Sequence, residues 1–123
     1  MNADENQADL TERIIGAVFE VSNTLGSGFL EKVYERALLR ELKLRGLAAV
    51  SQASFRVMYK GESVGEYFGD IVVEDAVVIE LKCADQCLNY LRAPGKTLCL
   101  LVNFQKPIVE FKRVALSYQI CRG

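Results

Sequence analysis

The sequence predicts one α/β domain, because the spacing of its apolar residues changes from a helical period to a strand period partway along the chain. Apolar side chains recur every three or four positions over residues 10–45 and form short or alternating runs over residues 55–116. The chain has 123 residues and is 50% hydrophobic, which suits one packed core. We expect a flexible N-terminus over residues 1–9 and a single domain over residues 10–123, with a mixed central sheet flanked by helices.

Two amphipathic helices are expected in the first third of the chain. Asp9 and Glu12 fit a capping box at the start of the first helix, which Gly26-Ser27-Gly28 ends. The second helix is expected to run from Phe29 to Arg45, with Gly46 at its C-terminal stop. The apolar stripe of the first helix consists of Leu10, Ile14, Val18, Val21 and Leu25.

Five strands and a short helix are expected in the rest of the chain. The strands cover residues 55–59, 64–73, 76–81, 97–102 and 108–116, and the helix covers residues 85–92. Lys60-Gly61 and Glu74-Asp75 form the turns between the first three strands. The β-branched run over residues 76–81 is typical of a central strand that is covered on both faces. The expected order of elements is therefore α-α-β-β-β-α-β-β.

The chain contains no histidine, which excludes several hydrolytic mechanisms. A Ser-His-Asp triad, a Cys-His pair and a zinc site built on histidine are all ruled out. Hydrolytic chemistry would have to use carboxylates, lysine, tyrosine or cysteine. No apolar run approaches the roughly 18–20 residues of a membrane span, and the polar, acidic stretch Met1–Asp9 does not resemble a signal peptide. We therefore expect no membrane association and a cytoplasmic location.

The four cysteines of the chain contain no CxxC pair; they are Cys83, Cys87, Cys99 and Cys121. Free thiols that pack as small apolar side chains are the expected state in a chain without a signal peptide. A metal or iron–sulfur site at Cys83 and Cys87 is the less favoured alternative.

Charge is distributed unevenly along the chain, although the net charge is only −1. Residues 1–81 carry 8 basic and 14 acidic side chains, a net charge of −6. Residues 82–123 carry 7 basic and 2 acidic side chains, a net charge of +5. The C-terminal third could thus face a polyanion, and ordinary surface variation is the equally favoured alternative.

Three charged residues stand at the ends of two strands that are neighbours in the expected sheet. Asp70 lies near the end of one strand, and Glu80 and Lys82 end the next. The turn at Glu74-Asp75 makes these strands antiparallel, so Asp70 lies opposite the region of Glu80. Glu80 and Lys82 are two residues apart and share a face, whereas Leu81 points into the core. The pattern predicts that two carboxylates and an amine converge on one spot.

These residue types suit metal-dependent hydrolysis of a phosphodiester. Two adjacent carboxylates repel each other, and a hard cation such as Mg²⁺ relieves that repulsion. A bound metal would lower the pKa of a water molecule and polarise a phosphate. Lys82 could orient or deprotonate the water, or stabilise the charge on the phosphate. A surface salt bridge of Lys82 with Glu80 or Asp70 is the structural alternative for this short pattern.

Three segments of the chain resemble one known family. The segment GDIVVEDAVVIELK, residues 69–82, resembles the core motif of the PD-(D/E)xK nuclease superfamily. The segment GFLEKVY, residues 28–34, matches the motif of the GxxExxY proteins, a branch of that superfamily. The segment LNYLRAPGKTLCLLVNF, residues 88–104, is also similar to that branch. The resemblance covers residues 10–116 and implies a restriction-endonuclease-like fold.

The resemblance also implies roles for individual residues. Asp70, Glu80, Glu31 and the backbone carbonyl of Leu81 would bind Mg²⁺ or Mn²⁺, Lys82 would be the catalytic lysine beside Asp70 and Glu80, and Gln86, Tyr90 and Tyr34 would approach the substrate. A solvated helix charge is the alternative for Glu31, with Glu35 as its nearest rival. A helix cap and a core aromatic are the alternatives for Gln86 and Tyr90, which resemble the QxxxY motif of RecB-like nucleases.

The expected activity is Mg²⁺-dependent hydrolysis of DNA, with RNA as the second choice. A nuclease-like domain that binds nucleic acid or a protein partner without cutting is the main alternative. Only Cys83-Ala84-Asp85 separate Lys82 from Gln86, where family members usually carry a longer segment, and this favours the alternative. A plain interaction domain with structural charges is a third hypothesis. The sequence leaves the oligomeric state open, a homodimer included.

Overall fold

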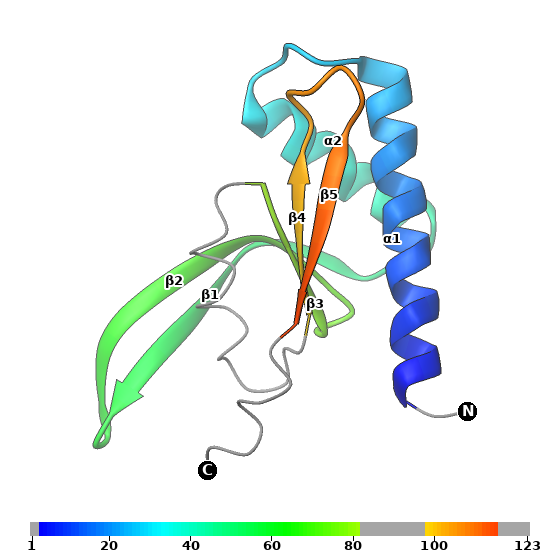
Figure 1. Cartoon of the computed structure of the whole chain (residues 1–123). Coiled ribbons are helices and arrows are strands. Elements are labelled where there is room, and N and C mark those ends of the chain that lie inside the picture. Colours follow the sequence, from blue (N-terminus) through cyan, green and yellow to red (C-terminus); the bar gives the residue numbers. More distant parts are fainter. Residues whose placement is uncertain (1–2, 82–97, 116–123) are drawn as a thin grey trace.

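The computed structural model describes residues 3–81 and 98–115. Within these ranges, two helices are followed by five strands that form one sheet (Figure 1). The prediction of an α/β fold is therefore confirmed. The helix expected over residues 85–92 lies outside the described residues.

Helix α1 spans Ala3–Leu25 and helix α2 spans Glu31–Leu44. The capping-box prediction is wrong, because α1 begins before Asp9, which lies inside the helix. Residues 3–8 contain neither glycine nor proline, so nothing in the sequence stops the helix from extending backwards. The flexibility of residues 1–9 stays a prediction.

Glycines follow both helices, as the sequence predicts. Gly26 has a φ of 72° after α1, and Gly46 has a φ of 81° after α2. The N–H of Gly46 donates to the Lys43 carbonyl at 3.0 Å. The N–H of Leu47 donates to the Leu42 carbonyl, also at 3.0 Å. This pair of bonds forms a Schellman motif, which satisfies carbonyls at the helix end and turns the chain toward the sheet.

The sheet is mixed, with the strands in sequence order from one edge to the other. The strands are β1 Ala49–Tyr59, β2 Glu62–Val73, β3 Val77–Glu80, β4 Leu98–Asn103 and β5 Glu110–Ala115. Neighbouring strands are antiparallel except for β3 and β4, which are parallel. β3, the most buried strand, lies in the middle of the sheet, as its β-branched sequence predicts.

Both predicted hairpin turns are confirmed. Lys60 and Gly61 join β1 to β2 with φ values of 49° and 85°. Glu74, Asp75 and Ala76 join β2 to β3, and Glu74 and Asp75 have φ values of 52° and 53°. Two successive positive φ values define type I′ turns, whose twist matches that of the strands they connect. The second turn sets the register between β2 and β3, the two strands that carry the predicted site.

The hairpin of β1 and β2 is longer than the sheet that it joins. β1 and β2 pair from Ala49 and Val73 at the base to Tyr59 and Glu62 at the tip. β2 pairs with β3 only over Ile71–Val73. The outer part of the hairpin therefore projects away from the body of the domain, as Figure 1 shows.

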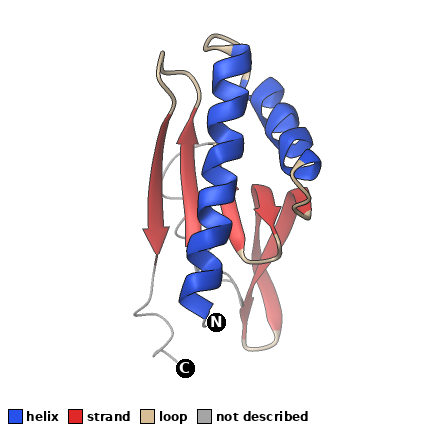
Figure 2. Ribbon diagram, turned by 90° about the vertical axis from the view of Figure 1, so that its right-hand side faces the viewer, coloured by secondary structure: helices blue, strands red, loops and turns tan. Residues whose placement is uncertain are grey.

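Both described helices pack on the same face of the sheet (Figure 2). Alternate residues of the central strands point to that face, in keeping with the two-residue period of a strand. The core side chains are Ile14, Ala17, Val18, Val21, Tyr34, Leu38 and Leu42 from the helices and Ile71, Val73, Val77, Ile79, Leu98, Leu100 and Val102 from the strands. The intervening strand residues, Asp70 and Glu80 among them, therefore lie on the face opposite the helices.

Apolar residues on that opposite face are buried as well. Val72 is 5% exposed, and Val78 and Cys99 are 0% exposed. Cys99 is disulfide-bonded, so the expectation of a free thiol is wrong for Cys99. The spacing of the cysteines along the sequence does not show which of them approach one another in the fold. No helix in the described part of the chain is long and apolar enough to cross a membrane.

Candidate functional site

Asp70 and Glu80 lie side by side at the end of the pairing between β2 and β3. The register pairs Ile71 with Ile79 and Val72 with Val78, and its continuation places Asp70 opposite Glu80. Side chains directly opposite on antiparallel strands are about 5 Å apart at their Cβ atoms and point to the same face. The sequence-based expectation that these two carboxylates face each other is therefore confirmed by the register.

Both carboxylates are removed from solvent. Asp70 is 1% exposed and Glu80 is 0% exposed. Burying one ionised carboxylate is costly, and a neighbouring carboxylate adds repulsion. Such an arrangement favours a bound cation, because a cation offsets both costs. The alternative of a salt bridge with Lys82 stays open, because Lys82 lies outside the described residues.

The carboxylate of Asp70 is fixed by the backbone of the neighbouring strand. The N–H of Leu81 donates to Oδ2 of Asp70 at 2.7 Å. This bond lies beyond the last backbone pair between β2 and β3, so the side chain of Asp70 replaces a partner in the ladder. It ties the end of β3 to Asp70 and leaves Oδ1 of Asp70 out of this contact. The side chain of Leu81 packs against the core, as expected.

The segment Gly28-Phe29-Leu30-Glu31 brings the start of α2 to this end of the sheet. Gly28 has a φ of 108°, which favours glycine, and Leu30 is the N-cap of α2. Glu31 is the first residue of the helix, where a negative charge is stabilised by the helix dipole. Glu31 and Leu81 line one small cavity, so Glu31 lies next to the residue that bonds to Asp70.

Tyr34 is the residue that holds this loop in place. Its hydroxyl donates to the Gly26 carbonyl at 2.6 Å and accepts the N–H of Phe29 at 3.2 Å. Its ring stacks on Phe104, with centroids 4.7 Å apart. Because Tyr34 is 1% exposed, its visible role is to fix the loop that carries Glu31. Contact of Tyr34 with substrate stays a prediction.

A second link joins the same loop to the connection between β4 and β5. The side-chain amide of Gln105 donates to the Phe29 carbonyl at 2.7 Å. Phe104 and Gln105 therefore hold the loop from the sheet side, whereas Tyr34 holds it from α2. Phe104 and Gln105 were not singled out as site residues by the sequence analysis, although Phe104 ends the family-like segment of residues 88–104 and both directly follow a buried strand.

Glu35, the rival of Glu31, has structural partners instead. Glu35 is 5% exposed, and both of its oxygens accept the amide of Gln52 at 3.3 and 3.4 Å. The ammonium of Lys32 lies 3.4 Å from Oε2 of Glu35. Gln52 has a φ of 56°, an irregular backbone conformation within β1. This irregularity in β1 directs the amide of Gln52 to α2.

The structure does not gather all the predicted ligands into one cluster. Residues 3–81 and 98–115 contain no group of three or more acidic or cysteine side chains that could hold a metal ion. Asp70 and Glu80 come together, whereas Glu31 approaches them only through the shared contact with Leu81. Lys82, Gln86 and Tyr90 lie outside the described residues, so their predicted roles stay predictions.

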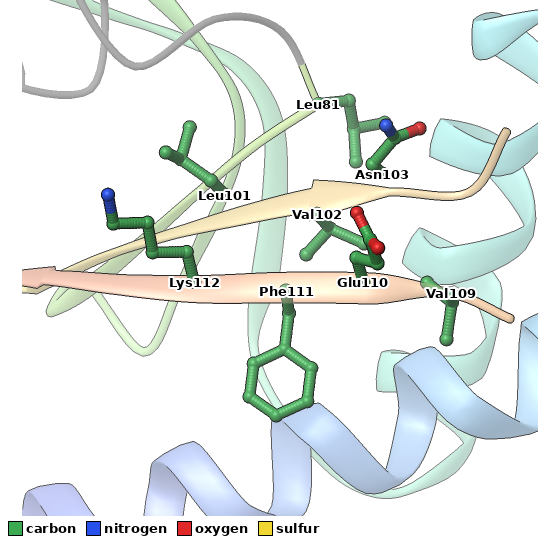
Figure 3. Close-up of a pocket in the computed structure, with 8 residues that line it drawn as sticks. All are labelled: Leu81, Leu101, Val102, Asn103, Val109, Glu110, Phe111 and Lys112. Carbon is green, nitrogen blue, oxygen red and sulfur yellow. The ribbon is translucent and has the colours of Figure 1, made fainter. Parts of the chain in front are cut away.

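A larger cavity opens beside the carboxylate pair, over the ends of β4 and β5 (Figure 3). Its volume is about 640 Å³, which is in the range of ligand-binding pockets. Its lining residues are Leu81, Leu101, Val102, Asn103, Val109, Glu110, Phe111 and Lys112. Leu81, whose N–H bonds to Asp70, lines both cavities. The larger cavity therefore starts next to the carboxylate pair and continues over β4 and β5.

A mixed sheet with helices packed on it and an acidic pair at the end of two adjacent central strands agrees with the core that the motif of residues 69–82 predicts. The model of the PD-(D/E)XK nuclease superfamily matches residues 8–114. The chain belongs to the PD-(D/E)XK nuclease superfamily. No curated protein and no solved structure matches the chain.

Proposed function

We propose that the protein is a metal-dependent nuclease that hydrolyses phosphodiester bonds of DNA. The observation that carries the proposal is the buried pair of Asp70 and Glu80 on neighbouring strands, in a chain of the PD-(D/E)XK nuclease superfamily. The GxxExxY motif of residues 28–34 points to a particular branch of that superfamily, and membership of that branch is part of the proposal.

The donor set fits Mg²⁺ or Mn²⁺. Both cations prefer oxygen ligands, and Mg²⁺ is typically held by one or two carboxylates together with phosphate oxygens. Asp70 and Glu80 supply two buried carboxylates, and the backbone carbonyl of Leu81 and the carboxylate of Glu31 are the further candidates. A bound divalent cation would supply a more acidic water and a polarised phosphate.

The residues of the chain then have distinct tasks. The bond from the Leu81 N–H holds the Asp70 carboxylate in one orientation before any substrate arrives. Glu80, from the adjacent strand, supplies the second carboxylate of the pair. Lys82 would lie on the same face of its strand as Glu80, where its ammonium can orient a water or stabilise phosphate charge. Glu31 would act from α2, in a loop that Tyr34 fixes.

A cleavage assay tests the proposal. The purified chain is incubated with single-stranded, duplex and branched DNA, each with Mg²⁺ and with Mn²⁺, beside the Lys82→Ala and Asp70→Asn variants. The wild-type chain should give product, and each variant should lose more than about a hundredfold in rate while its thermal unfolding stays cooperative. The Lys43→Ala variant is the matched control, because Lys43 is an exposed lysine in the last turn of α2.

The second candidate is a nuclease-like domain that binds nucleic acid or a protein partner without cutting. The three-residue connection between Lys82 and Gln86 favours it, because this length differs from that of the family motif. A chain of this kind would give no product with either metal but would keep a salt-dependent affinity for DNA that Asp70→Asn does not weaken. Absence of both cleavage and DNA binding at low salt would exclude nucleic acid as the partner.

A further inference from the structure

The cavity over β4 and β5 has one side that faces the same way as the carboxylate pair. In Figure 3, Leu101, Asn103, Glu110 and Lys112 project from one side of the two strands, and Phe111 projects from the other. The ring of Phe111 meets Phe19 of α1 edge to face, with centroids 6.0 Å apart, which identifies its side as the helix face. The first four residues therefore lie on the face that carries Asp70 and Glu80.

Lys112 lies in the same cross-strand row as that pair. The parallel register places Glu80 beside Leu101, and the antiparallel register places Leu101 beside Lys112. With Asp70 opposite Glu80, one row crosses four strands in the order Asp70, Glu80, Leu101, Lys112. The row begins with two negative charges and ends with a positive charge.

The distances along this row suit a nucleic-acid strand. Neighbouring strands are about 4.8 Å apart, so the backbone of Lys112 lies about 10 Å from that of Glu80. The four-carbon stem of lysine lets its ammonium reach back over Leu101 or outward into solvent. A phosphate at the carboxylate pair and the next phosphate of the same strand can therefore lie at the two ends of the row.

The surroundings of Lys112 in the described part of the chain leave its charge available to a ligand. Lys112 is exposed, and no carboxylate pairs with it within residues 3–81 and 98–115. Leu101 is partly buried and gives the row an apolar middle, on which a sugar or base can rest. Glu110 and Asn103 form the next row, so the negative charge of Glu110 would keep a phosphate at the Lys112 end of the cavity.

We propose that this cavity holds the DNA strand next to the cleavage point, and that Lys112 is a positioning residue that binds the phosphate adjacent to the scissile one. The inference rests on the proposed nuclease function and assigns it a substrate-binding side chain that lies outside the D…ExK motif. A single-stranded oligonucleotide is the simplest probe of this row, because the row would contact one backbone.

Another explanation for an exposed lysine on β5 is protection of a sheet edge. β5 is an edge strand of the sheet within the described residues, and lysines on such strands discourage pairing with another chain. Arg113 is the next residue of β5, carries the same charge and is also exposed. It pairs with Leu100, which points to the helix face, so Arg113 points to that face as well. Arg113→Ala is therefore the matched control for Lys112→Ala.

Binding and cleavage are both measured for wild type, Lys112→Ala, Arg113→Ala and Lys112→Arg. Affinity for a fluorescent single-stranded oligonucleotide is titrated in Ca²⁺, which fills an oxygen site but does not replace Mg²⁺ in catalysis, at several NaCl concentrations. Lys112→Ala should bind several-fold more weakly, and its log–log salt slope should fall by about 0.7, the value for one phosphate contact on a single strand. In Mg²⁺ its KM should rise several-fold while kcat changes less than about twofold, which is the pattern of lost uniform binding.

The comparison between variants decides the outcome. Arg113→Ala should match wild type in affinity and salt slope, and Lys112→Arg should restore both quantities. If Lys112→Ala and Arg113→Ala behave alike while the wild-type chain cleaves DNA, the assignment of Lys112 is overturned and the nuclease function stands. If the wild-type chain neither cleaves nor binds DNA, the proposed function fails, and the assignment fails with it. Thermal unfolding of each variant identifies any loss of binding that comes from misfolding.

Discussion

Tyr34 and Glu31 are three residues apart on one helix, yet their environments differ. Tyr34 is buried, and its hydroxyl contacts two backbone groups of the preceding loop. Glu31 is exposed in the first turn of α2. The three fixed positions of the sequence pattern GxxExxY thus have different roles. Gly28 allows the backbone conformation of the loop, and the hydroxyl of Tyr34 holds the loop in place. Glu31 lies exposed at the start of the helix that follows the loop.

Replacement of Tyr34 by phenylalanine should destabilise the protein without disturbing its core. The ring would keep its stack on Phe104, but the Gly26 carbonyl and the Phe29 N–H would lose their partner. We expect a loss of about 1–2 kcal/mol in the free energy of unfolding, measured by urea denaturation. Tyr59→Phe is the control, since Tyr59 is 60% exposed, and equal losses for the two variants would contradict the role given to Tyr34.

The two glutamates of α2 should separate stability from activity. Glu31→Gln should change the free energy of unfolding by less than about 0.5 kcal/mol, because Glu31 is exposed, while it lowers the cleavage rate. Glu35→Ala should cost about 0.5–1.5 kcal/mol, because it removes the hydrogen bonds between the buried Glu35 carboxylate and the Gln52 amide. Urea denaturation and the cleavage assay check the two effects. Loss of activity only in the Glu35 variant would transfer the functional role to Glu35.

At the scale of elements, the turn between β2 and β3 is the feature on which the site depends. Glu74 and Asp75 both adopt positive φ, although neither is glycine. The Glu74 carboxylate accepts the N–H of Ala48 at 2.6 Å, and the Glu74 N–H donates to the Ala48 carbonyl at 2.8 Å. These bonds compensate for backbone strain at Glu74 and connect the turn to the start of β1.

Asp75→Gly should therefore stabilise the protein. Glycine adopts the φ of 53° without the strain that a side chain adds, so we expect a gain of about 0.5–1 kcal/mol in the free energy of unfolding. Asp75→Ala should give no gain, since alanine keeps the strain of a side chain at this φ, and both variants lose the Asp75 carboxylate equally. A thermal or urea unfolding series on the three proteins measures the difference, and equal effects of Gly and Ala would show that strain is not the cause.

Elements with strong local signals were predictable from the sequence, and their ends were not. The amphipathic stripe of α1 and the turns at Lys60-Gly61 and Glu74-Asp75 are set by neighbouring residues. The start of α1 was misplaced at Asp9, because a capping residue stops a helix only where the preceding residues cannot be helical. The irregularity at Gln52 was missed, since it depends on Glu35, which is 17 residues away.

At the scale of the whole molecule, long-range register decides what the sequence could reveal about the site. Asp70 and Glu80 are joined by a short connection of three residues, Glu74, Asp75 and Ala76, so their approximate juxtaposition followed from local counting. The neighbours of Glu80 on the other side come from β4 and β5, across a long connection whose length does not fix register. Lys112 was therefore not identifiable as a neighbour of the site, and neither was the disulfide of Cys99.

Metal binding should be visible in the stability of the whole domain. A cation that binds the folded site but not the unfolded chain stabilises the fold by about 2.7 kcal/mol at a hundred times its Kd. Mg²⁺ or Mn²⁺ should therefore raise the Tm of the wild-type protein, and Asp70→Asn should abolish that rise. Asp9→Asn, on the exposed face of α1, should keep it. Calorimetry with and without metal measures these shifts, and an equal response of wild type and Asp70→Asn would place the metal elsewhere.

The projecting hairpin has a consequence for how this domain can change over evolutionary time. Because β2 pairs with β3 only over Ile71–Val73, the outer part of the hairpin can lengthen or shorten without displacing Asp70. The stretch between Ile71 and Glu80 has no such freedom. One residue inserted in either strand there would rotate a carboxylate through the sheet to the helix side. We therefore expect length variation among natural variants to concentrate at the hairpin tip and to be absent between the two acidic residues.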